Sequence, residues 1–188
     1  MVYRSTNFQM MGEINNVKIS VLFHSVFPMS HFFNTAISRN VYISQKRNFL
    51  VIKDGFSITI FQESDNQYHL NVTGIQSFDQ VDEVVNWLIV TYCPSEFFRY
   101  ISHQVDNVTA TYNFGYKLPL QKIACYLAPC KYNTERFPGL HMKSEKGAAI
   151  IFESGKVNIV GYSSEQEVKT GWESVKKRID SAVDKIQI

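Results

Sequence analysis

The sequence contains few of the residues that build disulfide, zinc or membrane-spanning structures. It has three cysteines among 188 residues, an odd number without Cys-x-x-Cys spacing, so neither a disulfide framework nor a zinc site is expected. No apolar run approaches the roughly 18 residues that span a bilayer. Residues 1–16 hold no apolar signal-peptide core. We therefore expect a protein that is not secreted, has no membrane partner and occupies a reducing compartment.

The residues and motifs of catalysis are equally sparse. Five histidines are scattered along the chain, and neither a zinc-protease, a phosphate-loop, a dinucleotide nor a nucleophile-elbow motif is present. Cys125 lies in a short apolar segment, where we expect a small buried side chain rather than a nucleophile. The sequence thus predicts no enzymatic activity, no cofactor and no metal site.

Charge is also low, and the remaining composition is that of a globular protein. The formal net charge is +2, which neither requires nor excludes a nucleic-acid partner. Hydrophobic residues make up 45% of the chain and charged residues 19%, so a sizeable core is expected and disorder is not.

One pattern of elements occurs twice, about 90 residues apart. An alternating strand, a short helix, four short strands and a long amphipathic helix are predicted for residues 15–93 and again for residues 106–188. Residues 1–14 are predicted to be a short tail. Residues 94–105 are predicted to be a junction, too apolar for a free linker, so both repeats are expected to share one sheet.

Strand alternation separates two faces of this sheet. One face is aliphatic and suits the packing of helices: Val17, Ile19, Val21, Ile58, Ile60, Leu70, Val72, Val108, Ala110, Ala149, Ile151, Val157 and Ile159. The other face mixes asparagine, threonine, small aliphatic residues and a few phenylalanines. Such a face is too apolar for one that only meets solvent, which indicates a binding surface. The alternative is a face covered by the protein's own loops.

Two stretches of the second repeat resemble a known family. The segment "RFPGLHMK" followed by "AAIIFESGKVNIVG" (Arg136–Gly161) resembles the Phe-Pro-Gly-Leu turn and Ser-Gly-Lys hairpin of the TATA-box-binding protein family. The segment "DNVTATYNFGYKLPLQKIA" (Asp106–Ala124) is similar to the start of that family's second repeat. The resemblance extends less specifically over the first repeat.

The resemblance implies a fold and a function. The fold would be an α+β saddle, in which two βαββββα pseudo-repeats form one curved antiparallel sheet with helices on its convex side. The function would be that of a transcription initiation factor, a monomer on DNA, that binds and bends A·T-rich double-stranded DNA through the minor groove. Its expected protein partners are transcription factor IIB-like initiation factors and RNA polymerase. Its expected location is the nucleus or, for a viral protein, a cytoplasmic replication site or the virion.

The resemblance also implies roles for particular residues. Phe137 and Phe152 match the family's pair of phenylalanine wedges in the second repeat, and Asn16 and Asn107 match its base-contacting asparagines. In the first repeat Phe61 matches Phe152. The residue in the outer wedge position of this repeat is either Phe49 or Arg47. The remaining DNA-facing residues would be Lys18, Thr59, Asn71, Thr73, Thr109, Ala148, Ile150, Lys156, Asn158 and Val160.

Basic side chains and departures from the family pattern complete the prediction. Lys18, Lys143, Lys156 and Arg136 are candidate phosphate contacts, or else ordinary solvated charges. Lys18 stands where the family has an apolar residue, so we expect an altered sequence preference there. A second hypothesis is therefore a scaffold of the same fold that binds proteins rather than DNA in a transcription complex or viral particle.

Overall fold

The computed structural model describes residues 12–93 and 98–186, and the predicted order of elements occurs in it twice. The first series is β1 (Glu13–Ser25), α1 (Met29–Ser38), β2 (Tyr42–Gln45), β3 (Phe49–Asp54), β4 (Phe56–Ser64), β5 (Gln67–Ile75) and α2 (Gln80–Tyr92). The second series is β6 (Phe98–Asn113), α3 (Leu120–Ile123) with the 3₁₀ turn η1 (Ala124–Tyr126), β7 (Cys130–Lys131), β8 (Leu140–Lys143), β9 (Ala148–Ile151), β10 (Lys156–Tyr162) and α4 (Glu165–Ile186).

The ten strands form one hydrogen-bonded sheet in the order β2-β3-β4-β5-β1-β6-β10-β9-β8-β7. Each neighbouring pair whose register is described is antiparallel. The α+β class and the single antiparallel sheet with helices are thus as predicted. β6 already begins at Phe98, inside the segment predicted to be a junction, and β1 begins at Glu13, inside the predicted tail. Residues 1–11 and 94–97 lie outside the described part of the chain.

Contacts divide the chain into two compact units. The N-terminal unit is Asn15–Val108, and the C-terminal unit consists of residues 12–14 together with 109–186. Because β6 runs from Phe98 to Asn113, one strand contributes residues to each unit.

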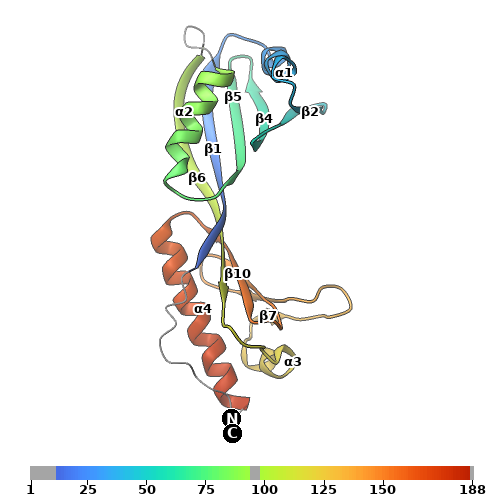
Figure 1. The fold of residues 1–188 in the computed structure, drawn as a ribbon, viewed down its shortest axis with the longest axis vertical. Coiled ribbons are helices and arrows are strands. Elements are labelled where there is room, and N and C mark those ends of the chain that lie inside the picture. Colours follow the sequence, from blue (N-terminus) through green and yellow to red (C-terminus); the bar gives the residue numbers. More distant parts are fainter. Residues whose placement is uncertain (1–11, 94–97, 187–188) are drawn as a thin grey trace. The chain divides into compact units, whose positions relative to one another are not determined.

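The core of the N-terminal unit consists of the predicted aliphatic face. Ile19 pairs with Val72 and Val21 with Leu70 across β1 and β5, and all four side chains are buried. α2 runs along β5 (Figure 1) and buries one stripe, listed here: Val81, Val84, Val85, Leu88 and Tyr92. Each fully buried aliphatic side chain contributes roughly 1.5–3 kcal/mol relative to an exposed one.

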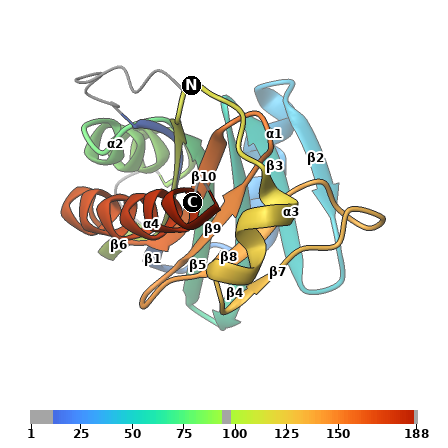
Figure 2. The same ribbon diagram turned by 90° about the horizontal axis from the view of Figure 1, so that it is seen from below.

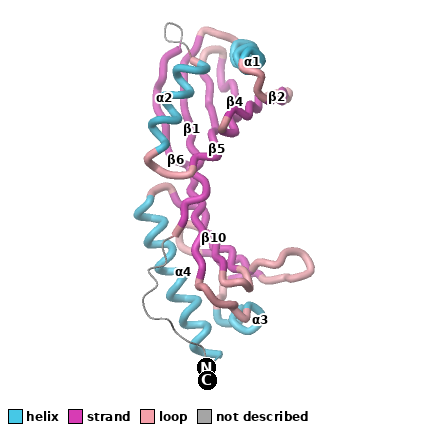
Figure 3. Tube along the Cα trace, viewed as in Figure 1, coloured by secondary structure: helices cyan, strands magenta, loops and turns pink. Residues whose placement is uncertain are grey.

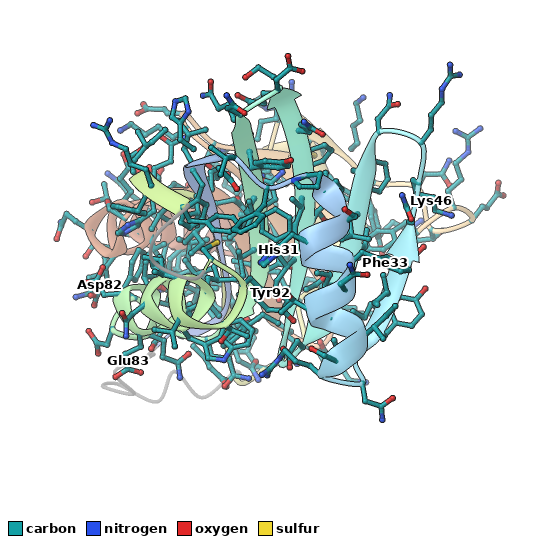
Figure 4. All side chains as sticks on the ribbon, turned by 90° about the horizontal axis from the view of Figure 1, so that it is seen from above. His31, Phe33, Lys46, Asp82, Glu83 and Tyr92 are labelled. Atoms are coloured by element: carbon teal, nitrogen blue, oxygen red, sulfur yellow. The ribbon has the colours of Figure 1, made fainter. Side chains whose placement is uncertain are left out.

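Polar contacts link α1 and α2 to the sheet in this unit. Asp54 at the end of β3 accepts hydrogen bonds from Arg39 Nε (2.6 Å) and from the Tyr92 hydroxyl (2.8 Å). The bond from Arg39 is the main reason that the pKa of Asp54 lies below its usual value, although partial burial opposes it. His31 of α1 lies beside the last turn of α2, where its Nε2 is 3.2 Å from the Tyr92 carbonyl oxygen (Figure 4).

The C-terminal unit is built around α4. This helix runs along β10, and α3 packs against it (Figure 2). Trp172 stacks on Tyr112 of β6 with ring centroids 4.1 Å apart. The Ser164 hydroxyl accepts the Glu167 amide hydrogen at 3.2 Å and so caps the N-terminus of α4. Arg178 donates hydrogen bonds to the carbonyl oxygens of Leu127, Ala128 and Lys143.

Candidate nucleic-acid interface

The sheet face opposite the core of the N-terminal unit carries the predicted polar set. Thr59 pairs with Asn71, which also lies opposite Ser20, and Thr73 pairs with Ser57. Thr59, Asn71 and Thr73 are half-buried, whereas the neighbouring Ile58, Ile60, Leu70 and Val72 on the other face are fully buried. The division into two faces is therefore as predicted, and the polar face keeps part of its surface accessible.

Two phenylalanines of the N-terminal unit lie together on this face. Phe49 of β3 is the register partner of Phe61 of β4, and their ring centroids are 5.5 Å apart. Both rings are half-buried, and His69 of β5 lies next to Phe61 at 6.4 Å. Arg47 is exposed in the loop between β2 and β3. Of the two residues left open by the sequence, Phe49 is the one that the structure brings against Phe61.

The C-terminal unit brings the other phenylalanine pair together. A long loop, drawn in pink in Figure 3, joins β7 to β8. Phe137 belongs to this loop by its position in the sequence, and its ring is 6.0 Å from that of Phe152 at the end of β9. Phe137 is 39% exposed and Phe152 is half-buried. His141 of β8 packs against Phe137 at 5.0 Å. Neither ring is buried in the core, which is the condition that a DNA wedge has to meet.

A short turn and a glycine hold Phe137 in place. The Phe137 amide donates to the Asn133 carbonyl oxygen at 3.0 Å. A Cβ atom on Gly139 would lie 2.6 Å from Phe137 Cε1 and 2.8 Å from Ile150 Cγ2, so only glycine leaves the ring where it is.

The rest of this unit's polar face follows β6, β9 and β10. Thr109 is half-buried on β6. Ile150 pairs with Asn158 and Ala148 with Val160, and all four side chains are half-buried. Asn158 accepts a hydrogen bond from the Thr111 hydroxyl at 2.9 Å. This face is thus a mixture of small apolar and amide side chains.

Basic side chains of the C-terminal unit lie at the ends of its strands. Lys156 begins β10, Lys143 ends β8 and Arg136 precedes Phe137 in the loop. All three are exposed. Their exposure is compatible with phosphate contacts and equally with ordinary solvated charges.

The two predicted asparagines both belong to the N-terminal unit. Asn16 is half-buried on β1, and its Oδ1 accepts a hydrogen bond from the Gly74 amide at 2.7 Å. The side-chain NH₂ of Asn16 is therefore the part oriented away from that backbone bond. Asn107 is half-buried on β6. An amide NH₂ is a donor, and donors are what the acceptor-rich minor groove of A·T pairs requires.

A polar cluster around Asp106 is not predictable from the sequence pattern of either strand. Asp106 lies 3.1 Å from Lys18 Nζ and accepts hydrogen bonds from the Ser20 hydroxyl and from Gln104 Nε2, the latter at 3.0 Å. Partial burial raises the pKa of Asp106, but the bonds from Ser20, Lys18 and Gln104 outweigh it, so the pKa lies below its ordinary value. The only sequence signal was Lys18, an unexpected charge among apolar neighbours.

Other candidate sites receive no support. Cys125 is exposed on η1 rather than buried as expected, because the helix there is shorter than predicted, and its thiol donates to the Lys122 carbonyl oxygen at 3.1 Å. Within residues 12–93 and 98–186, no three metal-ligating side chains gather into a site. None of the helices in these ranges combines the length and apolarity needed to cross a bilayer.

Comparison with known proteins gives one consistent family. Residues 102–182 match the family described as "Transcription factor TFIID (or TATA-binding protein, TBP)". A TATA-box-binding protein of Pyrobaculum islandicum is 37% identical over 70 residues, which are 36% of this chain and 35% of that protein. The TATA-box-binding protein of Thermococcus kodakarensis is 32% identical over 112 residues, 57% of each chain. The match thus spans only about a third to three-fifths of the length of these relatives.

A solved structure extends the similarity in fold to most of the chain. Methanococcus jannaschii TBP superposes with a TM-score of 0.74 and covers 90% of this chain and 98% of its own. The two sequences are 21% identical, so this comparison concerns the fold alone.

Proposed function

We propose a function from one premise: this chain is a member of the TATA-box-binding protein family. Its function is then that of a transcription initiation factor that binds A·T-rich duplex DNA through the minor groove, as a monomer, and bends it. The bound complex recruits transcription factor IIB-like factors and RNA polymerase, in the nucleus or, for a viral protein, at a cytoplasmic replication site or in the virion. This is a binding function, without a catalytic step or a cofactor.

The observation that carries the proposal is that each unit holds one pair of accessible phenylalanines. Phe49 meets Phe61 at 5.5 Å, and Phe137 meets Phe152 at 6.0 Å. Rings that only stabilised the core would be buried, as Phe23 and Phe32 are. Apolar side chains inserted into a base step partly unstack it and bend the duplex, most cheaply at flexible TA steps. One phenylalanine pair in each unit would allow two such insertions, one from each unit.

The remaining face suits A·T pairs. Their minor-groove edges present acceptors only, which amide and hydroxyl groups can satisfy by donating hydrogen bonds. Asn16, Thr59, Asn71 and Asn158 offer such groups between small apolar side chains. A guanine amine would be buried without a partner wherever the face is apolar. Exposed Lys156, Lys143 and Arg136 supply phosphate contacts.

A direct binding experiment tests this proposal. Fluorescence anisotropy with an A·T-rich duplex and a G·C-rich duplex of equal length should show tighter binding to the first, at both low and physiological salt. Equal affinity for the two duplexes, or no binding to either, would contradict it.

The second candidate function is a protein-binding scaffold. It is favoured by Asp106 and Glu63, because carboxylates on the binding face oppose a polyanionic partner. Here the same experiment decides, since a scaffold has no affinity for the A·T-rich duplex beyond a salt-sensitive background.

A further inference from the structure

The cluster around Asp106 is a carboxylate built into the candidate binding face. Lys18 and Ser20 reach it from β1, and Gln104 reaches it from its own strand, β6. Ser20 is itself buried and lies opposite Asn71, which in turn lies opposite Thr59. The cluster therefore belongs to the polar face of the N-terminal unit rather than to the core face beneath the helices.

Asp106 is held in one position but keeps capacity for a ligand. A carboxylate has about four acceptor positions. Lys18 and Ser20 occupy two of them on Oδ2, and Gln104 occupies one on Oδ1. The Asp106 side chain is 20% exposed, and Oδ1 accepts one hydrogen bond where it could accept two, so the carboxylate keeps capacity for a ligand. The depressed pKa keeps this group ionised, hence an acceptor only, at neutral pH.

The minor groove offers one group that fits such an acceptor. Adenine N3 and thymine O2 are acceptors and repel a carboxylate, whereas the exocyclic amine of guanine is a donor. Asp106 contacts Ser20, whose register partner Asn71 is one of the residues expected to face the DNA. A carboxylate at this place costs binding energy over an A·T pair and gains a charge-assisted hydrogen bond over a G·C pair.

We propose that Asp106 accepts a hydrogen bond from the amine of one guanine, so that this protein reads a single G·C pair within an otherwise A·T-rich site. Lys18 is a positioning residue, which orients the carboxylate and offsets its charge next to the phosphates. This inference rests on the proposed function, because it assigns a specificity to that same surface.

The test isolates the guanine amine. A G·C pair and an inosine·C pair differ in the minor groove only by this amine. The base pair at each position of an A·T-rich duplex is therefore replaced in turn by G·C and by inosine·C. At one position, the wild-type chain should bind the guanine duplex roughly tenfold more tightly than the inosine duplex, the size expected for one good base contact. At the other positions the inosine duplex should bind more tightly.

Substitutions then assign the effect to its residue. Asp106→Ala should abolish the guanine preference at that position. Asp180→Ala is the matched control, because Asp180 is also paired with a lysine, Lys176 at 2.6 Å, but lies on α4, and it should leave the preference unchanged. Circular dichroism and thermal unfolding establish that each variant is folded, and the guanine–inosine comparison on the wild-type chain stands without any variant.

Three results would overturn the inference. Tighter binding of inosine at every position shows a face with no acceptor for the amine, and leaves the proposed function standing. An Asp106→Ala chain that binds all duplexes more tightly, with an unchanged ratio of guanine to inosine affinity, shows a carboxylate that only repels DNA. Failure to bind any A·T-rich duplex removes the proposed function and this inference together.

Discussion

The two phenylalanine pairs reach a similar juxtaposition from different local structures. In the N-terminal unit both rings stand on strands, with Phe49 and Phe61 as register partners of β3 and β4. In the C-terminal unit Phe137 comes from a loop and meets Phe152 where β9 ends. The first pair depends on strand register and the second on a turn and on Gly139. A contact between two phenylalanine rings is therefore common to both units, while the local structure that holds the rings is not.

The charges around the two pairs also differ. His69 beside Phe61 is 3.2 Å from Glu63, an ion pair only when the histidine is protonated, while His141 contacts Phe137 and Lys156 lies beyond Phe152 on the next strand. A polyanionic ligand would thus meet a carboxylate near the first pair and an exposed lysine near the second. We expect the C-terminal unit to carry the larger share of the electrostatic attraction.

The largest effect is expected from removing one ring of each pair. Phe152→Ala and Phe61→Ala should each reduce the bend of an A·T-rich duplex and weaken its binding by about 2–3 kcal/mol, because the lost wedge no longer offsets unstacking. Energy transfer between dyes at the duplex ends reports the bend, and anisotropy reports the affinity. Val90→Ala on the exposed side of α2 is the control. An unchanged bend in Phe61→Ala would restrict wedge insertion to the C-terminal unit.

A smaller effect is expected from Gly139→Ala. The added Cβ would displace the Phe137 ring and Ile150, at a cost of roughly 1–3 kcal/mol in stability, and should lower the bend as well. Thermal unfolding and the same energy-transfer duplex measure both. Asn48→Ala, in the exposed loop before Phe49, adds no such clash and should leave both unchanged. Equal behaviour of the two variants would mean that the second pair does not depend on its glycine.

The polar links between helices and sheet should respond differently to acid in the two units. The pKa of Asp54 is depressed, so its stabilising effect is complete above about pH 4, the unfolded value, and is lost as the pH falls through the lower folded value. Asp54→Asn should therefore cost about 1 kcal/mol at pH 7, and this cost should shrink as the pH falls below about 4 and through the lowered folded pKa.

The reference for this measurement is Arg178→Met in the C-terminal unit. Arg178 binds backbone carbonyl oxygens, which do not titrate, so the cost of this substitution should stay constant from pH 7 to pH 2. Urea unfolding of the three chains at several pH values provides the comparison. A cost of Asp54→Asn that is independent of pH would exclude the ionised Arg39–Asp54 pair as its source.

The smallest effect is expected from Lys156→Gln. Loss of one phosphate contact should weaken binding to A·T-rich and control duplexes by the same factor and lower the salt slope by about one unit. Titrations at several salt concentrations give the slope. Lys46→Gln, in the loop before Phe49, should change the slope less if the C-terminal unit carries more of the attraction. A loss confined to the A·T-rich duplex would make Lys156 a base contact.

Much of the fold could be predicted because its periodicity is local. The alternation of Val17, Ile19 and Val21, or of Leu70 and Val72, is visible within one strand, and these side chains are buried as predicted. Phe137 and Phe152 stood out because a Pro-Gly turn and a Ser-Gly turn flank them. The expectation for Cys125 was wrong because the end of a short helix is set by tertiary packing, which converts it to a 3₁₀ turn and exposes the thiol.

What escaped prediction depends on register between distant strands. The choice between Phe49 and Arg47 requires the register of β3 against β4, which pairs Phe49 with Phe61 and which the sequence of one strand does not specify. The contact of Asp106 with Ser20 joins residues 86 positions apart and requires β1 and β6 to be neighbours. Such contacts leave no periodic signal, since a slip of one residue exchanges the faces of a strand. The DNA-binding roles of the individual residues stay predictions.

The hydrogen bond from the Gly74 backbone amide to Asn16 Oδ1 uses only one end of the Asn16 side-chain amide. Its oxygen accepts the Gly74 amide hydrogen beside the register shift of the β1–β5 pair, and its nitrogen is the donor that the proposed DNA contact uses. An aspartate at this position would keep this hydrogen bond, because a carboxylate oxygen also accepts from the Gly74 amide, but it would present an acceptor where a donor had been. Fold and recognition are thereby separable within a single side chain. In the proposed DNA-binding role of Asn16, an aspartate at position 16 would therefore change what the protein recognises without changing how it folds.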